Sequence, residues 1–330
     1  MGTAELSCAS LEKLAGLRDF QIAAVVTQPD RPKGRELKEQ SSPVKTLALR
    51  QGLPVLQPAC ARDEKFTAAL RGLQPDLIVV VAYGQILPQS ILDLPRHSCL
   101  NVHTSLLPKY RGAAPIQWAI ANGDADTGIT IMKMDAGLDT GLLVAQRRIP
   151  ILPEDDSATL HDRLAQLGAE LLVQTIPYYV AGKIQLRPQP AEGVSLAPKI
   201  KKEDGRIDWN LPAQMIWNRL RAFTPWPGAF TSLPGAVGRA SSRAETETCG
   251  RLAETLAPLK PHLLKIWKAE VVEKSGAPGE VLSADKNGIV VACGQGALRI
   301  LELQRESSRR MNAADFLAGH PLKPGEDFLV

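Results

Sequence analysis

Short runs of consecutive apolar residues alternate with helix-like segments through the first part of the chain. Residues 22–26 and 77–81 are apolar at successive positions, whereas residues 43–51 and 63–73 have the apolar spacing of helices. Strands that are apolar on successive residues are typical of a sheet covered by helices on both faces. The alternation therefore predicts an α/β domain with a doubly wound, mostly parallel sheet.

The pattern continues to about residue 185 and then changes. Residues 99–103 predict one more strand, and residues 156–181 carry apolar positions near helical spacing. That helix would close a first domain of residues 1–185. Residues 186–204 gather prolines, a glycine and lysines, which cannot continue a helix, so this stretch predicts a linker.

The remainder of the chain has a different hydrophobic pattern. Short β-like runs separated by Gly, Pro or Asn predict that residues 205–330 form a small OB-like β-barrel. Residues 233–261 are rich in Gly, Ser, Thr and Glu and lack a core pattern, so we expect a mobile insertion there. Lys and Arg outnumber Asp and Glu by 16 to 13 in residues 205–330, against 23 to 22 in residues 1–204. This excess is compatible with a polyanionic partner.

The composition is that of a globular protein. Of 330 residues, 44% are hydrophobic and 22% are charged, which excludes disordered and fibrous classes. Because no apolar run approaches the ~20 residues that cross a bilayer, we expect a cytoplasmic protein with no membrane partner. The five cysteines are scattered without a C-x-x-C pair, which argues against a metal knuckle. We expect a monomer.

The most informative stretch, NVHTSLLPKYRG, begins within the predicted strand of residues 99–103. Residues i and i+2 of a strand project to the same side, so Asn101 and His103 share a face where open parallel sheets bind ligands. Asp139 lies further on in DAGLDTG, whose glycines indicate a tight turn. An amide, an imidazole and a carboxylate with no nearby nucleophilic Ser or Cys favour direct transfer of a group between two substrates.

Each of these residues has a chemical role in such a transfer. Asn101 would donate a hydrogen bond to an oxyanion, His103 would shuttle protons near neutrality, and Asp139 would orient His103. Taken singly, an Asn, a His or an Asp is more often a turn former or a satisfied surface group. The three together favour the catalytic interpretation.

The same stretch resembles the signature of formyltransferases that use 10-formyltetrahydrofolate, and in particular the methionyl-tRNA formyltransferase family. The resemblance covers nearly the whole chain. It implies a Rossmann-like first domain, a catalytic triad of Asn101, His103 and Asp139, and no metal. The family's folate-contacting stretch matches the SLLP segment, which comprises Ser105, Leu106, Leu107 and Pro108.

Features outside that signature resemble the tRNA-specific family. TQPDRPKGR resembles its tRNA-contacting loop, and RIDW and RAFTPWPGAF resemble its domain junction. The resemblance implies formyl transfer to the α-amino group of methionyl-initiator tRNA through a tetrahedral intermediate. Phosphates require basic partners, and the candidates for tRNA contact are Arg35, Lys38, Lys199, Lys201 and Lys202. For the linker lysines a solvated face is nearly as good an interpretation, because KIKKED passes quickly into acidic residues.

The start of the chain departs from the family pattern. Family members usually begin with a short apolar strand, whereas this chain starts at Met1 inside the turn that follows that strand. We therefore expect the first strand to be missing, which would leave ladder groups and apolar surface exposed. A form extended upstream is expected to be more stable.

Other functions use parts of the same pattern. A sugar-nucleotide amine formyltransferase would share the chemistry, but the basic-leaning second domain and the QPDRPKGR loop argue against that acceptor. A non-catalytic RNA-binding protein built on an OB-like barrel would leave Asn101, His103 and Asp139 unexplained. A dinucleotide-binding oxidoreductase is set aside because Gly294-Gln295-Gly296 lacks the third glycine of G-x-G-x-x-G.

Overall fold

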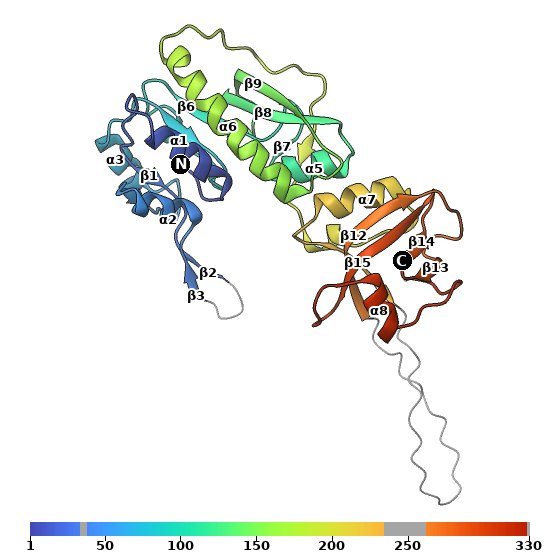
Figure 1. Ribbon diagram of the computed structural model, residues 1–330. Coiled ribbons are helices and arrows are strands. Elements are labelled where there is room, and N and C mark those ends of the chain that lie inside the picture. The colour runs from blue at the N-terminus through green and yellow to red at the C-terminus, as the bar shows by residue number, and fades with distance from the viewer. Residues whose placement is uncertain (34–37, 234–261, 329–330) are drawn as a thin grey trace, which may run out of the picture. The chain divides into compact units, whose positions relative to one another are not determined.

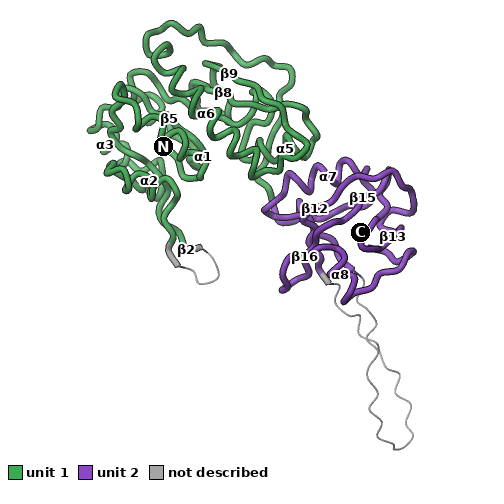
Figure 2. Tube along the Cα trace, in the orientation of Figure 1, with its two compact units in different colours: residues 1–200 green, residues 201–330 purple. Residues whose placement is uncertain are grey.

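The computed structural model describes residues 1–33, 38–233 and 262–328. The chain forms two compact units, residues 1–200 and residues 201–330 (Figures 1 and 2). The division falls inside the predicted linker of residues 186–204. Among the described residues, no helix is both long enough and apolar enough to span a bilayer.

Unit 1 alternates helices with strands as the hydrophobic pattern predicts (Figure 1). Its helices are α1 (Leu6–Ala15), α2 (Pro43–Arg50), α3 (Glu64–Gly72), α4 (Gln89–Leu92), α5 (Pro115–Ala121) and α6 (Ser157–Val180). Its strands are β1 (Val25–Val26), β2 (Arg31–Lys33), β3 (Lys38–Gln40), β4 (Val55–Leu56), β5 (Ile78–Val80), β6 (Cys99–His103), β7 (Arg111–Gly112), β8 (Asp126–Lys133), β9 (Leu142–Pro150) and β10 (Leu196–Ala197).

Helix starts in unit 1 follow local capping chemistry. The Ser42 hydroxyl accepts a hydrogen bond from the Lys45 amide (3.0 Å) at the start of α2, and Pro43 occupies the first turn. Asp156 caps α6 by accepting from the Ala158 and Thr159 amides, at 2.9 Å each. These caps satisfy amides that have no partner within the helix.

Helices cover both faces of the two-stranded sheet formed by β1 and β4. Val25 of β1 packs with Val44 and Ala48 of α2, whereas the next residue, Val26, packs with Phe66 of α3. Successive residues of a strand point to opposite faces, so α2 and α3 lie on opposite sides. The predicted α/β, doubly wound architecture is therefore present in this part of unit 1.

The direction of the later strands differs from the prediction. β5 pairs in parallel with β6, and β1 pairs in parallel with β4, but β8 runs antiparallel to both β6 and β9. The expectation of a mostly parallel sheet is wrong for β8 and β9. A parallel neighbour requires a crossover of about a dozen residues or more, and the loop of residues 134–141 between β8 and β9 is too short for one.

The residues ahead of α1 form a single bridge between two parts of the sheet. The Gly2 amide donates to the Val26 carbonyl, and the Val81 amide donates to the Met1 carbonyl, at 2.9 Å each. Gly2 and Val81 form a parallel bridge. A cavity of about 920 Å³ lies beside these residues, and its lining includes apolar residues from both β1 and β5. Met1 and Gly2 therefore link β1 to β5 through backbone hydrogen bonds.

Unit 2 is rich in antiparallel strands. Its strands are β11 (Ala229–Leu233), β12 (His262–Val272), β13 (Val281–Asp285), β14 (Gly288–Ala292), β15 (Ala297–Arg305) and β16 (Met311–Asn312), and its helices are α7 (Ala213–Ala222) and α8 (Ala313–Gly319). The pairing order is β11-β12-β15-β14-β13. Between the described residues of β11 and β13 no pairing closes the sheet, so the strands are confirmed and a closed barrel stays a prediction.

The boundary of the predicted insertion shifts by one residue. Leu233 ends β11 and pairs with His262 of β12, so it belongs to the sheet and the expectation that it starts a loop is wrong. The rest of the predicted insertion, residues 234–261, lies outside the described residues.

The core of unit 2 surrounds Trp209, whose indole nitrogen donates to the Thr231 hydroxyl (3.1 Å).

The cysteines offer a test of the buried strands. Burial raises the pKa of the Cys99 thiol in β6, and that of the Cys293 thiol, to about 12, whereas Cys60 is exposed. Since the thiolate is the reactive form, iodoacetamide at about pH 8 should alkylate Cys60 in the native protein and leave Cys99 and Cys293 unmodified. Peptide mass spectrometry measures each site. Native Cys99 reacting as fast as Cys60 would contradict the burial, and denaturant should make all three react.

Candidate active site

Two of the predicted catalytic side chains lie on β6. Asn101 and His103 occupy alternate positions of this strand, which places their side chains on the same face. The His103 side chain is 6% exposed, and its Nε2 lies 2.9 Å from the Tyr110 carbonyl oxygen. A carbonyl oxygen can only accept, so this contact assigns a proton to Nε2 and leaves Nδ1 facing Asp139.

The turn that carries Asp139 is held by its own side chains. Asp139 has a φ of +53°, in the left-handed region that few residues other than Gly adopt. The Asp135 carboxylate accepts from the Thr140 hydroxyl (2.7 Å) and the Gly137 amide (3.1 Å). A Cβ at Gly141 would collide with the Lys133 carbonyl, so only Gly fits there. Gly141 thus serves a close approach of backbones, whereas a Cβ at Gly137 would meet the Thr140 side chain.

The turn brings the Asp139 carboxylate to both side chains of β6. Its Oδ2 lies 3.7 Å from Nδ1 of His103 and accepts from the Gly112 amide at 2.8 Å. Its Oδ1 accepts a hydrogen bond from the side-chain amide nitrogen, Nδ2, of Asn101 at 3.4 Å. The Asp139 side chain is 14% exposed, so its charge is only partly screened by water. The three residues that the sequence singled out therefore lie together.

The predicted folate stretch lies just after β6, and most of it is buried. Ser105, Leu107 and Pro108 are buried, and the Ser105 hydroxyl donates to the Lys109 carbonyl (2.5 Å). Leu106 is half-buried. These contacts shape the loop that returns the Tyr110 carbonyl to His103.

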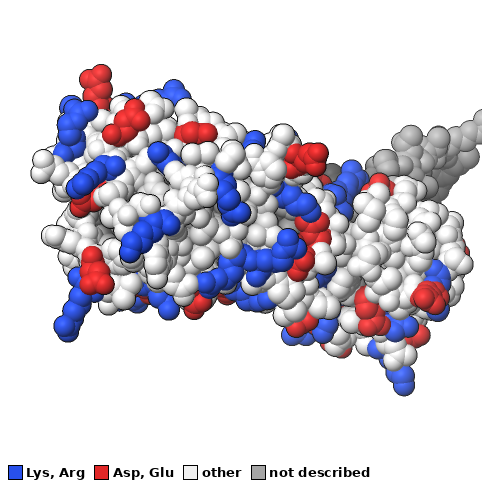
Figure 3. Space-filling view, turned by 90° about the horizontal axis from the view of Figure 1, so that it is seen from above, with Lys and Arg blue, Asp and Glu red and all other residues white. Residues whose placement is uncertain are grey.

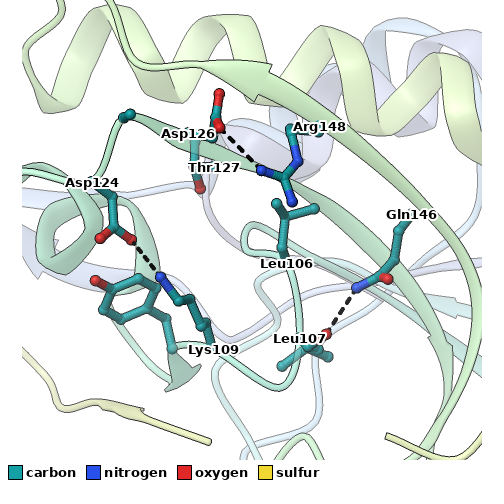
Figure 4. A pocket seen from close by; sticks show the side chains of 10 residues that line it. Leu106, Leu107, Lys109, Asp124, Asp126, Thr127, Gln146 and Arg148 are labelled. Carbon is teal, nitrogen blue, oxygen red and sulfur yellow. Dashed lines mark hydrogen bonds and ion pairs between the residues drawn. The ribbon is translucent and has the colours of Figure 1, made fainter. Parts of the chain in front are cut away.

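Behind this loop is a cavity of about 380 Å³, lined by Leu106 and Leu107 (Figure 4). Its rim carries two ion pairs, Lys109 with Asp124 at 3.5 Å and Arg148 with Asp126 at 3.0 Å. The Gln146 amide donates to the Leu107 carbonyl (2.9 Å). The charges of this cavity are thus neutralised by one another, and it offers no net charge for a ligand.

The predicted tRNA contacts are spread over both units. Lys199 is exposed on unit 1, and Lys201 and Lys202 are exposed on unit 2. Lys38 lies in β3, which pairs with β2 as a hairpin that the sequence did not predict, and Arg35 lies outside the described residues. On the face shown in Figure 3, acidic side chains are interspersed among the basic ones.

Sequence reasoning missed several parts of the site. Gly112 contributes a backbone amide and Tyr110 a backbone carbonyl, and neither has a side-chain signature. Leu138, beside Asp139 in the chain, is 59% exposed. A large apolar side chain left in water next to a residue of the polar constellation is a signal that only coordinates provide.

Comparison with known proteins follows the same division into units. Residues 5–176 match the formyl transferase family model, and residues 199–321 match the model of the formyl transferase C-terminal domain. The chain belongs to the formyl transferase family. A methionyl-tRNA formyltransferase of Myxococcus xanthus is 50% identical over 330 residues, covering 100% of this chain and 97% of that protein. One of Geobacter metallireducens is 48% identical, covering 98% of this chain and 96% of that protein.

A solved structure shares the fold of this formyl transferase. WlaRD, a sugar 3N-formyl transferase solved in the presence of dTDP and 5-N-formyl-THF, superposes with a TM-score of 0.61. The match covers 93% of this chain and 97% of WlaRD, at 18% sequence identity. At that identity the likeness concerns the fold, and the acceptor must be argued from closer relatives.

Proposed function

We propose that this formyl transferase moves the formyl group of 10-formyltetrahydrofolate to the α-amino group of methionyl-initiator tRNA. The product, formylmethionyl-tRNA, serves translation initiation. The observation that carries the chemistry is the meeting of Asn101, His103 and Asp139 within 3.4 to 3.7 Å at the end of β6. The choice of acceptor is supported by relatives of that name at 50% and 48% identity over nearly the whole chain.

The site has the properties that a reduced folate requires. The folate supplies the formyl carbon, attached to its N10. Asn101, His103 and Asp139 offer an amide, an imidazole and a carboxylate for the polar reacting atoms, while Leu138, next to Asp139, exposes apolar surface for a flat ring. Folate contact by Ser105, Leu106, Leu107 and Pro108 is part of the proposal.

The residues have separate tasks in the transfer. As the amine nitrogen bonds to the formyl carbon, an electron pair moves to the formyl oxygen. The Asn101 amide has two N–H groups, of which one donates to Asp139, and we assign the other to this oxyanion. Protonated His103 stabilises the same charge, held by Asp139. When the carbon–N10 bond breaks, a proton from the amine passes to N10, and this balances the reaction.

The decisive test compares acceptors. Purified protein with 10-formyltetrahydrofolate and charged methionyl-initiator tRNA should give formylmethionyl-tRNA and tetrahydrofolate, detected by acid gel electrophoresis and absorbance. A dTDP-linked amino sugar under the same conditions should remain unmodified. Formylation of the sugar alone would replace the tRNA proposal by the sugar-nucleotide alternative, and no transfer to either would remove the enzyme proposal.

We propose that basic residues on both units hold the tRNA backbone, with unit 2 as an OB-like tRNA-binding domain. Arg35 and Lys38 would supply the contacts of unit 1 outside the linker, and Lys199, Lys201 and Lys202 would supply those of the linker. Because each phosphate contact releases counterions, the logarithm of affinity should fall linearly with the logarithm of salt concentration.

Replacing the three linker lysines by Gln should reduce the slope of the salt dependence. Each lost contact is worth roughly 0.7 to 0.9 in that slope, so the triple variant should lose about 2 to 3. Filter binding at several salt concentrations measures it. As a matched control, exposed Lys13, Lys65 and Lys183 are changed to Gln together. Equal slopes for the two triple variants would favour the solvated-face interpretation.

A further inference from the structure

Gln189, in the predicted linker, joins two backbone segments of the site. Its Nε2 donates to the Asp139 carbonyl (2.8 Å) and to the Gly141 carbonyl (2.9 Å). Its Oε1 accepts from Nε (3.1 Å) and Nη2 (2.7 Å) of Arg111. A Gln amide has two N–H groups and one oxygen with two lone pairs, and here all four are used. The amide is therefore fixed in one orientation.

Both segments that Gln189 joins contact the Asp139 carboxylate. One segment is the turn of Asp139 itself, whose φ of +53° is disfavoured for Asp and needs outside support. The other is β7, where Arg111 precedes Gly112, and the Gly112 amide donates to Asp139 Oδ2 at 2.8 Å. Gln189 thus restrains the carboxylate from its own backbone and from its hydrogen-bond donor.

The main chain around Gln189 is anchored on either side of it. Arg187 and Leu143 exchange backbone hydrogen bonds at 2.8 and 3.1 Å, which ties the segment to β9. β10 pairs in parallel with β7, and the Ser195 hydroxyl accepts from the Tyr110 amide at 2.9 Å. The Gln189 side chain therefore starts from a fixed backbone, so it loses little conformational entropy when it forms its bonds.

We propose that Gln189 is a positioning residue that holds the Asp139 carboxylate against Asn101 and His103. The inference rests on the proposed function, because it assigns a task only if Asp139 takes part in transfer. Misplacement of a reacting group by about 1 Å can cost ~10²-fold in rate. Gln189 acts on the Asp139 backbone rather than on substrate, so its loss should affect turnover and leave substrate affinity intact.

The first variant removes the amide. Gln189→Ala should lower kcat by about tenfold while KM for the tRNA and for the folate stays within about twofold. Gln174 provides the matched control, because it also accepts from an arginine, Arg147 (2.7 Å), but lies on α6. Gln174→Ala should keep wild-type kcat. A Gln189→Ala enzyme with wild-type kcat would overturn the proposal.

The second variant keeps the size and reverses the hydrogen bonding. In Gln189→Glu the carboxylate still accepts from Arg111, but it has no N–H to offer the carbonyls of Asp139 and Gly141 and would repel them. Its kcat should fall at least as far as that of Gln189→Ala, with the thermal midpoint close to wild type. Wild-type kcat in Gln189→Glu would show that the Arg111 contact alone suffices, which contradicts positioning through the turn.

A double-variant cycle separates positioning from general damage. Asp139→Ala, Gln189→Ala and their combination are compared in single-turnover transfer. If Gln189 acts through Asp139, then Gln189→Ala should have no further effect once Asp139 is Ala. Independent, multiplicative effects would reject the inference. Wild-type activity of Asp139→Ala would instead reject the proposed role of Asp139, so the failures of the two proposals are distinguishable.

Discussion

Replacing Asp139 by Asn should lower kcat by roughly 10²- to 10⁴-fold, the usual range for loss of a group that directs proton transfer. The substitution keeps the size of the side chain and leaves an oxygen to accept from the Gly112 amide (2.8 Å). It removes the negative charge that faces Nδ1 of His103 at 3.7 Å. Affinity for the tRNA should be unchanged, because the residues proposed to contact the tRNA backbone do not include Asp139. Rapid-quench transfer and filter binding measure the two quantities.

The chain contains a matched control for Asp139→Asn. Asp162 of α6 also faces a histidine, with its Oδ1 2.9 Å from Nδ1 of His161, but its side chain is 82% exposed. Solvent screens such a pair, and it lies outside the site. Asp162→Asn should therefore have wild-type kcat. Near-normal turnover in Asp139→Asn, or an equal loss in Asp162→Asn, would overturn the assignment of Asp139.

The placement of the candidate catalytic side chains could be predicted because strand geometry is simple. Asn101 and His103 are two residues apart, so any strand through them presents both on one face. Asp139 was reached through its glycines and the family resemblance. Gly112 and Gln189 could not be found in this way. The first contributes a backbone amide, and the proposed role of the second depends on a main chain held next to the turn.

Strand positions were predicted only in part. The predicted strand of residues 99–103 matches β6, but no strand was predicted where β8 and β9 lie. Six consecutive residues of β8 are buried, a pattern that is also typical of a parallel strand. The hydrophobic pattern indicates that both faces of a strand are covered, but it does not indicate whether the neighbouring strand runs parallel or antiparallel to it. The antiparallel half of the sheet was therefore missed.

The linker shows why composition alone misjudges packing. Prolines and glycine in residues 186–204 correctly predict the absence of a long helix, but the segment is not a free connector. Ala197 is fully buried, and Ile200 is 6% exposed. Backbone pairing with β7 and the four bonds of Gln189 hold the segment against unit 1. A short irregular segment can order a site when its polar groups match those of a neighbouring loop.

Asn101 should show the second large effect. Loss of one oxyanion-stabilising donor typically costs ~2.7 to 4 kcal/mol, so Asn101→Ala is expected to lower kcat by about 10²- to 10³-fold. The truncation also removes the 3.4 Å hydrogen bond to Asp139, but at that length the bond is weak and its loss alone would account for little. The same single-turnover assay measures the effect, and Asn210→Ala in unit 2 serves as the control.

The charge of the replacement distinguishes the oxyanion role from simple packing. Asn101→Asp keeps the shape of the side chain but presents a carboxylate, both to Asp139 Oδ1 and to the developing negative charge. It should be slower than Asn101→Ala, because a like charge repels the oxyanion whereas a cavity admits water that can still donate a hydrogen bond. If Asn101→Asp retains more activity than Asn101→Ala, then the side chain matters for its volume, and donation to the oxyanion is the wrong assignment.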